Sequence, residues 1–144
     1  MRVLIADGGR KAAGFRGQAD DCVCRSIAIA GQLPYREVYD LINAYGKQER
    51  GVHTVIRGKS SARSGVYKDT QRAVLEHLGW PWTPTMRIGS GCRVHLADGE
   101  LPMGRLVVAV SRHLTAVIDG VIHDSHAPTR NGRRCVYGYW TAPS

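Results

Sequence analysis

The segment 113–126 (HLTAVIDGVIHDSH) limits the possible folds more than any other, because it predicts a β-hairpin of fixed register. Asp119 and Gly120 separate two runs rich in β-branched residues. An Asp-Gly pair in this setting is typical of a two-residue turn whose central residues both adopt positive φ. The turn pairs Ile118 with Val121, and the same register continues outward along both strands. We therefore expect a β-sheet in this part of the chain.

The hairpin register also predicts which side chains share a face of the sheet. His113 and Asp124 fall on one face as diagonal neighbours, about 7–8 Å apart and within side-chain reach. His123 points to the other face, whereas His126 lies opposite His113. A carboxylate that accepts a hydrogen bond from an imidazole fixes its tautomer and stabilises the imidazolium. The hairpin thus presents a His–Asp pair that needs only a nucleophile.

That nucleophile is predicted at the start of a helix within 20–31 (DDCVCRSIAIAG). Asp20 or Asp21 is a suitable N-cap, and Gly31 is a suitable C-terminal stop. Cys22 follows the two aspartates, so free N–H groups and the helix dipole favour its thiolate. The two carboxylates oppose this effect electrostatically. Cys22 is nevertheless well placed to attack a carbonyl with the help of the His–Asp pair.

Helices precede strands along the chain, which predicts an α+β domain with an antiparallel sheet. Amphipathic spacing over 34–45, opening at a proline, predicts a second helix, and 68–78 predicts a third. After residue 84 the pattern changes to period two or to β-branched runs. The expected strands cover residues 85–88, 93–96, 106–111, 114–118, 121–124 and 135–140, with a short strand at 2–6.

The length of 144 residues fits a single domain, with a helical part at about 20–79 and a sheet part at about 84–141. No apolar run approaches the roughly 20 residues that a membrane span needs. The start, MRVLIADGGRK, lacks the basic-then-apolar pattern of a signal peptide. We therefore expect a cytoplasmic protein with no membrane partner, whose four cysteines are reduced. The polar segment 46–65 is long for a loop and is interpreted as a potential lid.

The charge balance leaves the partner open. Twenty Lys and Arg residues against 12 Asp and Glu give a formal net charge of +8. Such a balance suits an acidic protein partner or nucleic acid, but it also serves solubility alone. The basic residues are scattered, with denser groups at 57–63 and 130–134, and they form no basic helix or nucleic-acid motif. We find no pattern that fixes the oligomeric state.

The helix start and the hairpin together resemble a known family. The segment 21–26 (DCVCRS) is similar to the D-C-x-x-R-A opening of small bacterial and phage-borne proteins of the papain-like cysteine peptidase superfamily. Four further stretches fit the resemblance: PYREVYDLI (34–42), RSGVY (63–67), HLTAVIDGVIHDSHAP (113–128) and RCVYGYW (134–140). The resemblance therefore extends over most of the chain.

The resemblance implies a papain-like α+β fold, with N-terminal helices packed on an antiparallel sheet. By matching positions, it implies that Cys22 is the nucleophile, that His113 is the general base and that Asp124 orients His113. The implied activity is thiol-dependent hydrolysis of a peptide or protein substrate without a cofactor, in the host cytoplasm if the chain is phage-encoded. Acyl transfer would use the same residues.

The sequence departs from the family pattern at the motif and before it. Ser26 stands where the opening motif has Ala. Papain-like enzymes often place an oxyanion-hole Gln six residues before the nucleophile, where this chain has Arg16 for Cys22. Gln18 lies four residues before Cys22 and six before Cys24. Gln18 is therefore a candidate for the oxyanion hole, and Cys24 is a rival nucleophile.

Two alternatives stay open. His113, Asp124 and His126 have the composition of a two-His-one-carboxylate metal site, although we expect no metal there. The chain could also be a non-catalytic binding module, such as a phage- or prophage-derived inhibitor that uses a basic surface. In either case Arg25 is expected to anchor the helix to Asp20, Asp21 or a sheet carbonyl. The three tryptophans at 80, 82 and 140 are expected to pack the sheet against the third helix.

Overall fold

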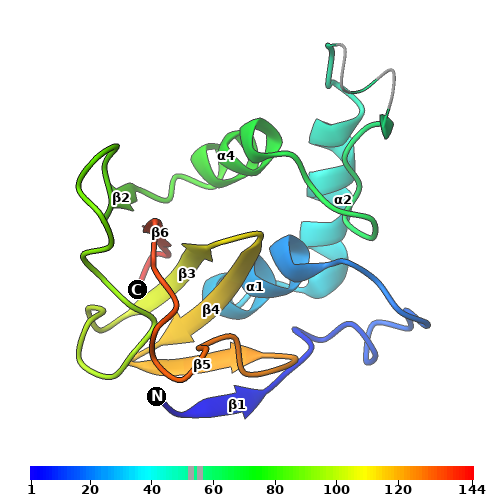
Figure 1. Cartoon of the computed structure of the whole chain (residues 1–144). Coiled ribbons are helices and arrows are strands. Elements are labelled where there is room, and N and C mark those ends of the chain that lie inside the picture. The colour runs from blue at the N-terminus through cyan, green and yellow to red at the C-terminus, as the bar shows by residue number, and fades with distance from the viewer. Residues whose placement is uncertain (52–53, 55–56) are drawn as a thin grey trace.

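A computed structural model describes residues 1–51, 54 and 57–144 and shows a mixed α+β arrangement (Figure 1). Within these residues, three helices are followed by most of a six-stranded sheet. The helices are α1 (Cys22–Gly31), α2 (Tyr35–Gly46) and α4 (Lys68–His77). The strands are β1 (Val3–Ile5), β2 (Trp82–Pro84), β3 (Arg105–Val110), β4 (His113–Ile118), β5 (Val121–Asp124) and β6 (Gly138–Thr141).

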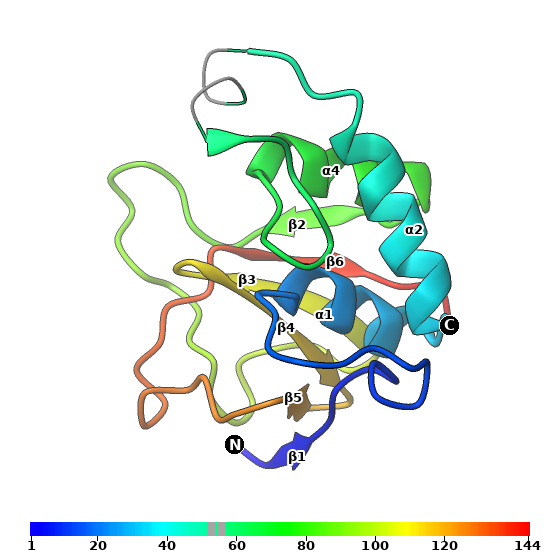
Figure 2. The ribbon, with the colours of Figure 1, turned by 90° about the vertical axis from the view of Figure 1, so that its right-hand side faces the viewer.

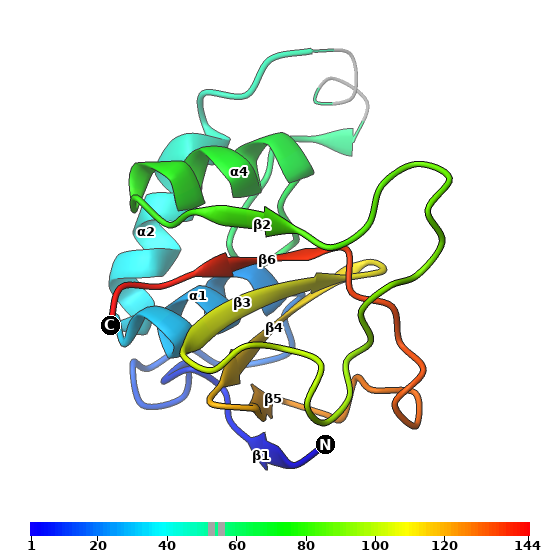
Figure 3. The same ribbon diagram turned by 90° about the vertical axis from the view of Figure 1, so that its left-hand side faces the viewer.

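The sheet has the strand order β1-β5-β4-β3-β6-β2, which Figure 3 shows from the side opposite α1. Neighbouring strands are antiparallel except β1 and β5, which pair in parallel. The expectation of a purely antiparallel sheet is therefore wrong at this edge. β1 precedes the helices and so enters the sheet by a long crossover rather than by a hairpin.

The predicted hairpin register is confirmed. Ile118 pairs with Val121, and Ala116 pairs with His123. Asp119 and Gly120 have φ values of 48° and 79°, as a turn with two positive-φ central residues requires. Because the strands are antiparallel, the first residue of β4 and the last residue of β5 lie at the same end of the sheet.

Helix α1 forms the centre of the larger apolar core. Its residues Val23, Ile27 and Ala30 are buried, as their helical spacing predicts. They pack with α2, α4 and the alternate residues of β3 and β4 that point toward the helices, among them Val107 and Ala116 (Figure 2). This packing fixes the N-terminus of α1 beside β4, where the predicted nucleophile lies.

The opposite face of the sheet has a second, smaller core closed by loops. Its strand residues include Leu106, Val108 and Val117, and the loop residues Leu96 and Val136 cover them. The long connection between β2 and β3 runs along this face (Figure 3).

A disulfide between Cys92 and Cys135, which lie 43 residues apart, joins two of these loops. The expectation of four reduced cysteines is therefore wrong, since only Cys22 and Cys24 are free. The two half-cystines are too far apart in sequence for spacing to reveal the pair. An isolated β-bridge between His95 and Cys135 holds the two loops side by side.

Several predicted strands differ from those observed. Residues 85–88 and 93–96 form no strand, and the last strand begins at Gly138 rather than at 135. Val94 and Leu96 pack on the smaller core, but their segment forms only the β-bridge between His95 and Cys135 and no strand. β2 at Trp82–Pro84 was not predicted, because the Trp80-Pro81-Trp82 segment before and at its start indicates the end of the preceding helix.

Part of the predicted loop at 46–65 is held against α2. The amide of Ser60 donates to Glu49, and the amide of Ala62 donates to the Asn43 side chain at 2.9 Å. Residues 52–53 and 55–56 of this segment lie outside the described residues, so its role as a lid stays a prediction. Across the described part of the chain, no helix is long and apolar enough to cross a membrane.

Candidate active site

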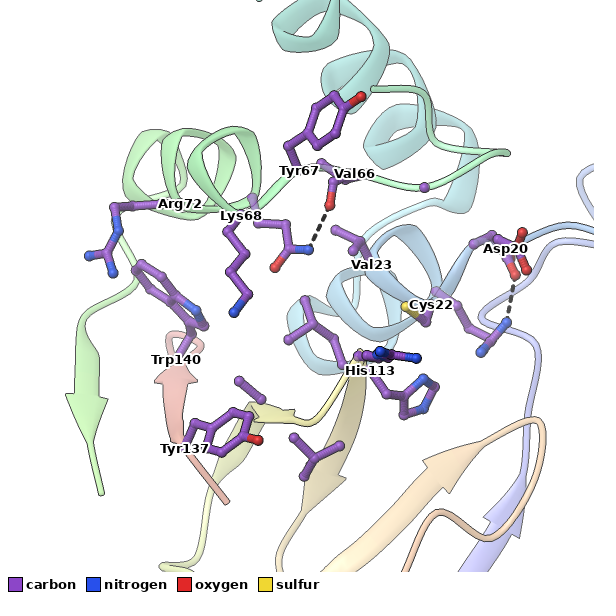
Figure 4. A pocket seen from close by; sticks show the side chains of 18 of the residues that line it. Asp20, Cys22, Val23, Val66, Tyr67, Lys68, Arg72, His113, Tyr137 and Trp140 are labelled. Atoms are coloured by element: carbon purple, nitrogen blue, oxygen red, sulfur yellow. Dashed lines mark hydrogen bonds and ion pairs between the residues drawn. The ribbon is translucent and has the colours of Figure 1, made fainter. Parts of the chain in front are cut away.

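The structure brings Cys22, His113 and Asp124 together at one end of the sheet. Nε2 of His113 lies 2.7 Å from Oδ2 of Asp124, and the Cys22 side chain lies near His113 (Figure 4), close enough for the imidazole to lower the pKa of the thiol. Because Nε2 is engaged by the carboxylate, Nδ1 is the ring nitrogen left for the sulfur. His113 is the first residue of β4 and Asp124 is the last residue of β5, so both lie at the end of the sheet that faces Cys22, the first residue of α1.

The Asp124 carboxylate is buried and fully engaged. Its side chain is 2% exposed, and Oδ1 accepts hydrogen bonds from the Arg25 guanidinium at 3.2 Å and from the Ser125 amide at 2.6 Å. Burial alone would raise the pKa of Asp124, but the hydrogen bond and charge of His113, with the Ser125 amide, hold it well below its usual value. Asp124 is therefore ionised and fixes the orientation of the imidazole.

The electrostatics favour a thiolate–imidazolium pair. Burial opposes a charge on His113, but hydrogen bonds to Asp124 and Cys22 outweigh it and raise the pKa of His113 to about 9. Burial would likewise raise the pKa of Cys22. Hydrogen bonds from His113 and from the Leu114 amide, together with the charges of His113 and Arg25, lower the Cys22 pKa below its ordinary value. Each partner thus stabilises the ionised form of the other.

The first turn of α1 is left open in front of Cys22. Asp21 occupies the N-cap position, as the sequence predicts, but its carboxylate makes no capping hydrogen bond. It accepts instead from Arg25 at 2.6 Å and from the Tyr35 hydroxyl at 2.9 Å. The first N–H groups of a helix have no acceptor within the helix. Because Asp21 turns away, the Cys22 amide remains available to an oxyanion.

Arg25 links the helix to the orienting carboxylate. Its guanidinium bonds to Asp21 on its own helix and to Asp124 at the end of β5. The expected anchoring of Arg25 to Asp21 is confirmed. The contact with Asp124 also ties Arg25 to the end of β5. The Arg25 charge also neutralises Asp21, which removes the repulsion that the sequence predicts between the aspartates and a thiolate at Cys22.

Behind Arg25, Tyr35 and Arg10 continue the polar network into the core. The Arg10 guanidinium donates to the Tyr35 hydroxyl at 3.0 Å, and Tyr35 in turn donates to Asp21. No sequence motif indicates a role for either residue. Tyr35 lies in the amphipathic spacing of 34–45 and Arg10 lies 25 residues before it, so no local pattern joins them.

Cys24 lies in a setting unsuited to a nucleophile. It is fully buried in the larger core, and its thiol donates to the Tyr35 carbonyl at 3.8 Å. Burial raises the pKa of Cys24 to about 12. The hydrogen bond with Tyr35 lowers this pKa in part, and the negative charge of Asp21 raises it further. A thiol with this pKa is almost entirely protonated at neutral pH. The geometry therefore favours Cys22 over its rival.

Gln18 lies apart from the cavity that exposes Cys22. It lines a smaller neighbouring hollow with Arg10, Arg63 and Ser64, and its backbone carbonyl accepts from Arg63 at 3.4 Å. The structure thus does not bring its side chain to the nucleophile. The Cys22 amide is the oxyanion donor that the geometry provides.

His126 completes a possible three-ligand cluster. One ligand atom each from His113, Asp124 and His126 lies within 4.8 Å of the others. The rings of the two histidines are 5.1 Å apart, and the His126 side chain is 56% exposed. Both carboxylate oxygens of Asp124 are already engaged by His113, Arg25 and a backbone amide. A metal ion would have to displace these partners, so the contacts favour the hydrogen-bonded pair over a metal centre.

A cavity of about 1100 Å³ opens beside Cys22 and His113. Val23 and Leu114 contribute apolar walls, whereas α4 and β6 supply basic and aromatic side chains (Figure 4). Trp80 and Trp140 are buried in the larger core and Trp82 packs against it, as predicted. The tilted rings of Trp82 and Trp140 have centroids 5.0 Å apart, and both residues also line the cavity. The cavity is large enough for part of a peptide chain.

No protein-family model, curated protein or solved structure matches the chain. Geometry and electrostatics are therefore the grounds on which a function is assigned.

Proposed function

We propose that this protein is a thiol-dependent hydrolase of peptide, isopeptide or other amide bonds. The observation that carries the proposal is the His113–Asp124 hydrogen bond with Cys22 beside His113, where both Cys22 and His113 line a large cavity. The papain-like resemblance of the sequence agrees with a nucleophile at a helix start and a His–Asp pair on later strands. Peptides or proteins are the substrates that suit an open cavity of this size.

The chemistry follows from the protonation states. The Cys22 thiolate attacks the carbonyl carbon, and the carbonyl π electrons move to oxygen, where the Cys22 amide stabilises the oxyanion. The tetrahedral intermediate collapses and the C–N bond breaks while His113 gives its proton to the departing amine. His113 then removes a proton from water, the hydroxide attacks the thioester, and the acid product leaves Cys22 as the thiolate. The same acyl-enzyme would transfer its acyl group to an amine in place of water.

Selective alkylation tests this proposal before a substrate is known. We expect iodoacetamide to label Cys22 quickly at pH 6–7, where an ordinary thiol of pKa about 8.5 is almost entirely protonated. Peptide mapping by mass spectrometry identifies the labelled residue. The Cys22→Ser protein should lose labelling and all hydrolysis of a fluorogenic peptide library, while Cys24→Ser should retain both.

Two outcomes would contradict the proposal. One is slow labelling of Cys22 with the pH dependence of an unperturbed thiol. The other is peptide hydrolysis that survives Cys22→Ser. Slow labelling together with tight, salt-dependent association with an acidic protein would instead support a binding module.

A further inference from the structure

We propose that Lys68, at the α4 side of the cavity, forms a subsite for an acidic side chain of the peptide substrate, next to the bond that Cys22 attacks. The inference rests on the proposed hydrolase function, because it names the substrate class of the same site. It is carried by the position, charge and surroundings of Lys68 and of the two residues beside it, Arg72 and Trp140.

Lys68 extends into the cavity without a counter-ion. It is the first residue of α4, and Figure 4 shows its side chain crossing the cavity toward the region between Trp140 and His113. Among the described residues, no carboxylate forms an ion pair with its ammonium group. Lys68 is an exposed residue, but the cavity that it lines is partly apolar, and such walls strengthen the attraction of a cation for an anion.

Arg72 adds a second positive charge on the same face of α4. It lies one turn beyond Lys68, lines the cavity, and holds its guanidinium 5.6 Å from the ring centre of Trp140. Its ion pair with Glu76 is long, at 3.9 Å, and exposed, so Arg72 keeps most of its capacity to bind an anion. A carboxylate between α4 and β6 would meet both cations.

The charge of the cavity is divided between its two ends. The Asp21–Arg25 pair and the Cys22–His113 pair are each close to neutral. Asp20 lies on the far side of Cys22 from Lys68 (Figure 4).

The remaining lining charges complete this division. Asp69, Arg57 and Arg112 also line the cavity and are exposed. On α4 the two lining cations, Lys68 and Arg72, outnumber the one lining carboxylate, Asp69. The α4 side is therefore the positive side, and it fixes the direction in which an acidic peptide would lie.

The reactive group decides between a peptide and other polyanions. A thiolate acts on a carbonyl carbon, which a peptide carries at every residue and a nucleic-acid backbone does not. The nearby Val23 and Leu114 walls suit the aliphatic part of a Glu or Asp side chain. An acidic peptide thus satisfies both the chemistry at Cys22 and the charge at Lys68.

Matched electrophilic peptides test the subsite. We would use dipeptidyl acyloxymethyl ketones that differ only by Glu, Gln or Lys at one position, and measure the rate of Cys22 labelling by intact-protein mass spectrometry. A charge-assisted contact predicts that Glu is preferred over Gln by about tenfold at one position. Lys68→Gln should remove the preference, and Lys68→Glu should reverse it in favour of Lys. The matched control is Lys11→Gln, which changes the net charge equally on an exposed loop outside the cavity.

The outcomes separate this inference from the function on which it rests. If iodoacetamide labels Cys22 but none of the peptidyl ketones does, the hydrolase proposal fails. If Glu and Gln ketones label Cys22 equally, the hydrolase stands and the subsite is wrong. In a third outcome, the Glu and Gln ketones label Cys22 equally, and a short oligonucleotide blocks this labelling in the original protein but not in Lys68→Glu. That result would assign these cations to nucleic-acid binding and overturn the acidic-peptide subsite.

Discussion

The two faces of the sheet are closed by different means, and the cysteines follow the difference. On one face, α1 and its neighbouring helices bury the larger core, and the free thiol of Cys22 lies at the end of α1 beside a charged network. On the other face, loops cover the smaller core, and the Cys92–Cys135 disulfide ties two of them together. Apolar packing holds the helices against the sheet, whereas the disulfide restrains the loops.

This difference assigns separate roles to the sulfur atoms. Where helices supply the packing, a cysteine is available for chemistry and polar groups are available to tune its pKa. Where loops supply the packing, the cysteines serve as a cross-link. The comparison predicts that changes on the helix-covered side alter reactivity and stability together, while changes on the loop-covered side alter stability alone.

Asp124→Asn should have the largest effect. It removes the charge that raises the His113 pKa, so His113 loses its proton at lower pH and Cys22 loses its partner. We expect hydrolysis, or peptidyl-ketone labelling at pH 7, to fall at least about a hundredfold. Rapid-quench labelling measures this directly. A fall of less than about threefold would show that the carboxylate does not orient the histidine.

Arg25→Met should cause the next largest effect, on stability. It leaves the buried carboxylates of Asp21 and Asp124 without their shared cation, which costs about 3–5 kcal/mol of unfolding free energy. Urea titration followed by tryptophan fluorescence measures the loss. Arg36→Met is the matched control, because its i,i+4 pair with Asp40 is exposed and contributes less than about 1 kcal/mol. Equal losses from the two variants would contradict the role of Arg25.

Replacing Cys92 and Cys135 by serine should lower the free energy of unfolding without changing the reactivity of Cys22. Closing a loop of 43 residues stabilises a protein by about 4 kcal/mol at most, and native disulfides typically contribute about 2–4 kcal/mol. We expect that loss in urea titration, with the rate of Cys22 alkylation unchanged within about twofold. A large change in Cys22 reactivity would show that the two faces are coupled.

Tyr35→Phe should produce the smallest effect. It removes the hydroxyl that joins Arg10 to Asp21 but keeps the ring packed against Phe15. The expected loss is about 1–2 kcal/mol, the usual cost of leaving buried polar groups without a partner. Tyr45→Phe on the same helix serves as the control and should change the unfolding free energy by less than about 0.5 kcal/mol. Equal values for the two tyrosines would remove Tyr35 from the network.

The sequence predicts the parts of the site that depend on local periodicity. Asp119-Gly120 sets the hairpin register, and that register alone brings His113 and Asp124 to one face. The helix start at Cys22 follows from the spacing of apolar residues in α1, and Asp21 stands at the N-cap position as predicted although its carboxylate bonds elsewhere. Each of these signals lies within about a dozen residues, where backbone geometry determines which side chains are neighbours.

The remaining parts depend on contacts between distant segments. The hydrogen bonds from Arg10 through Tyr35 to Asp21, the approach of Lys68 to the cavity and the Cys92–Cys135 bond each join separate elements. The parallel pairing of β1 with β5 has the same origin. Such contacts follow from the packing of the whole chain, which no local pattern encodes.

The pH dependence of Cys22 alkylation tests the central claim, the thiolate–imidazolium pair, most directly. Iodoacetamide rates from pH 4 to 10 should rise with a midpoint below the ordinary thiol pKa of about 8.5, because a lowered pKa keeps the thiolate at lower pH. A second inflection near pH 9 should mark loss of the His113 proton. In His113→Gln that inflection should vanish and the midpoint should move above 8.5, since burial then acts without its partner. A single midpoint at or above 8.5 in both proteins would contradict the account.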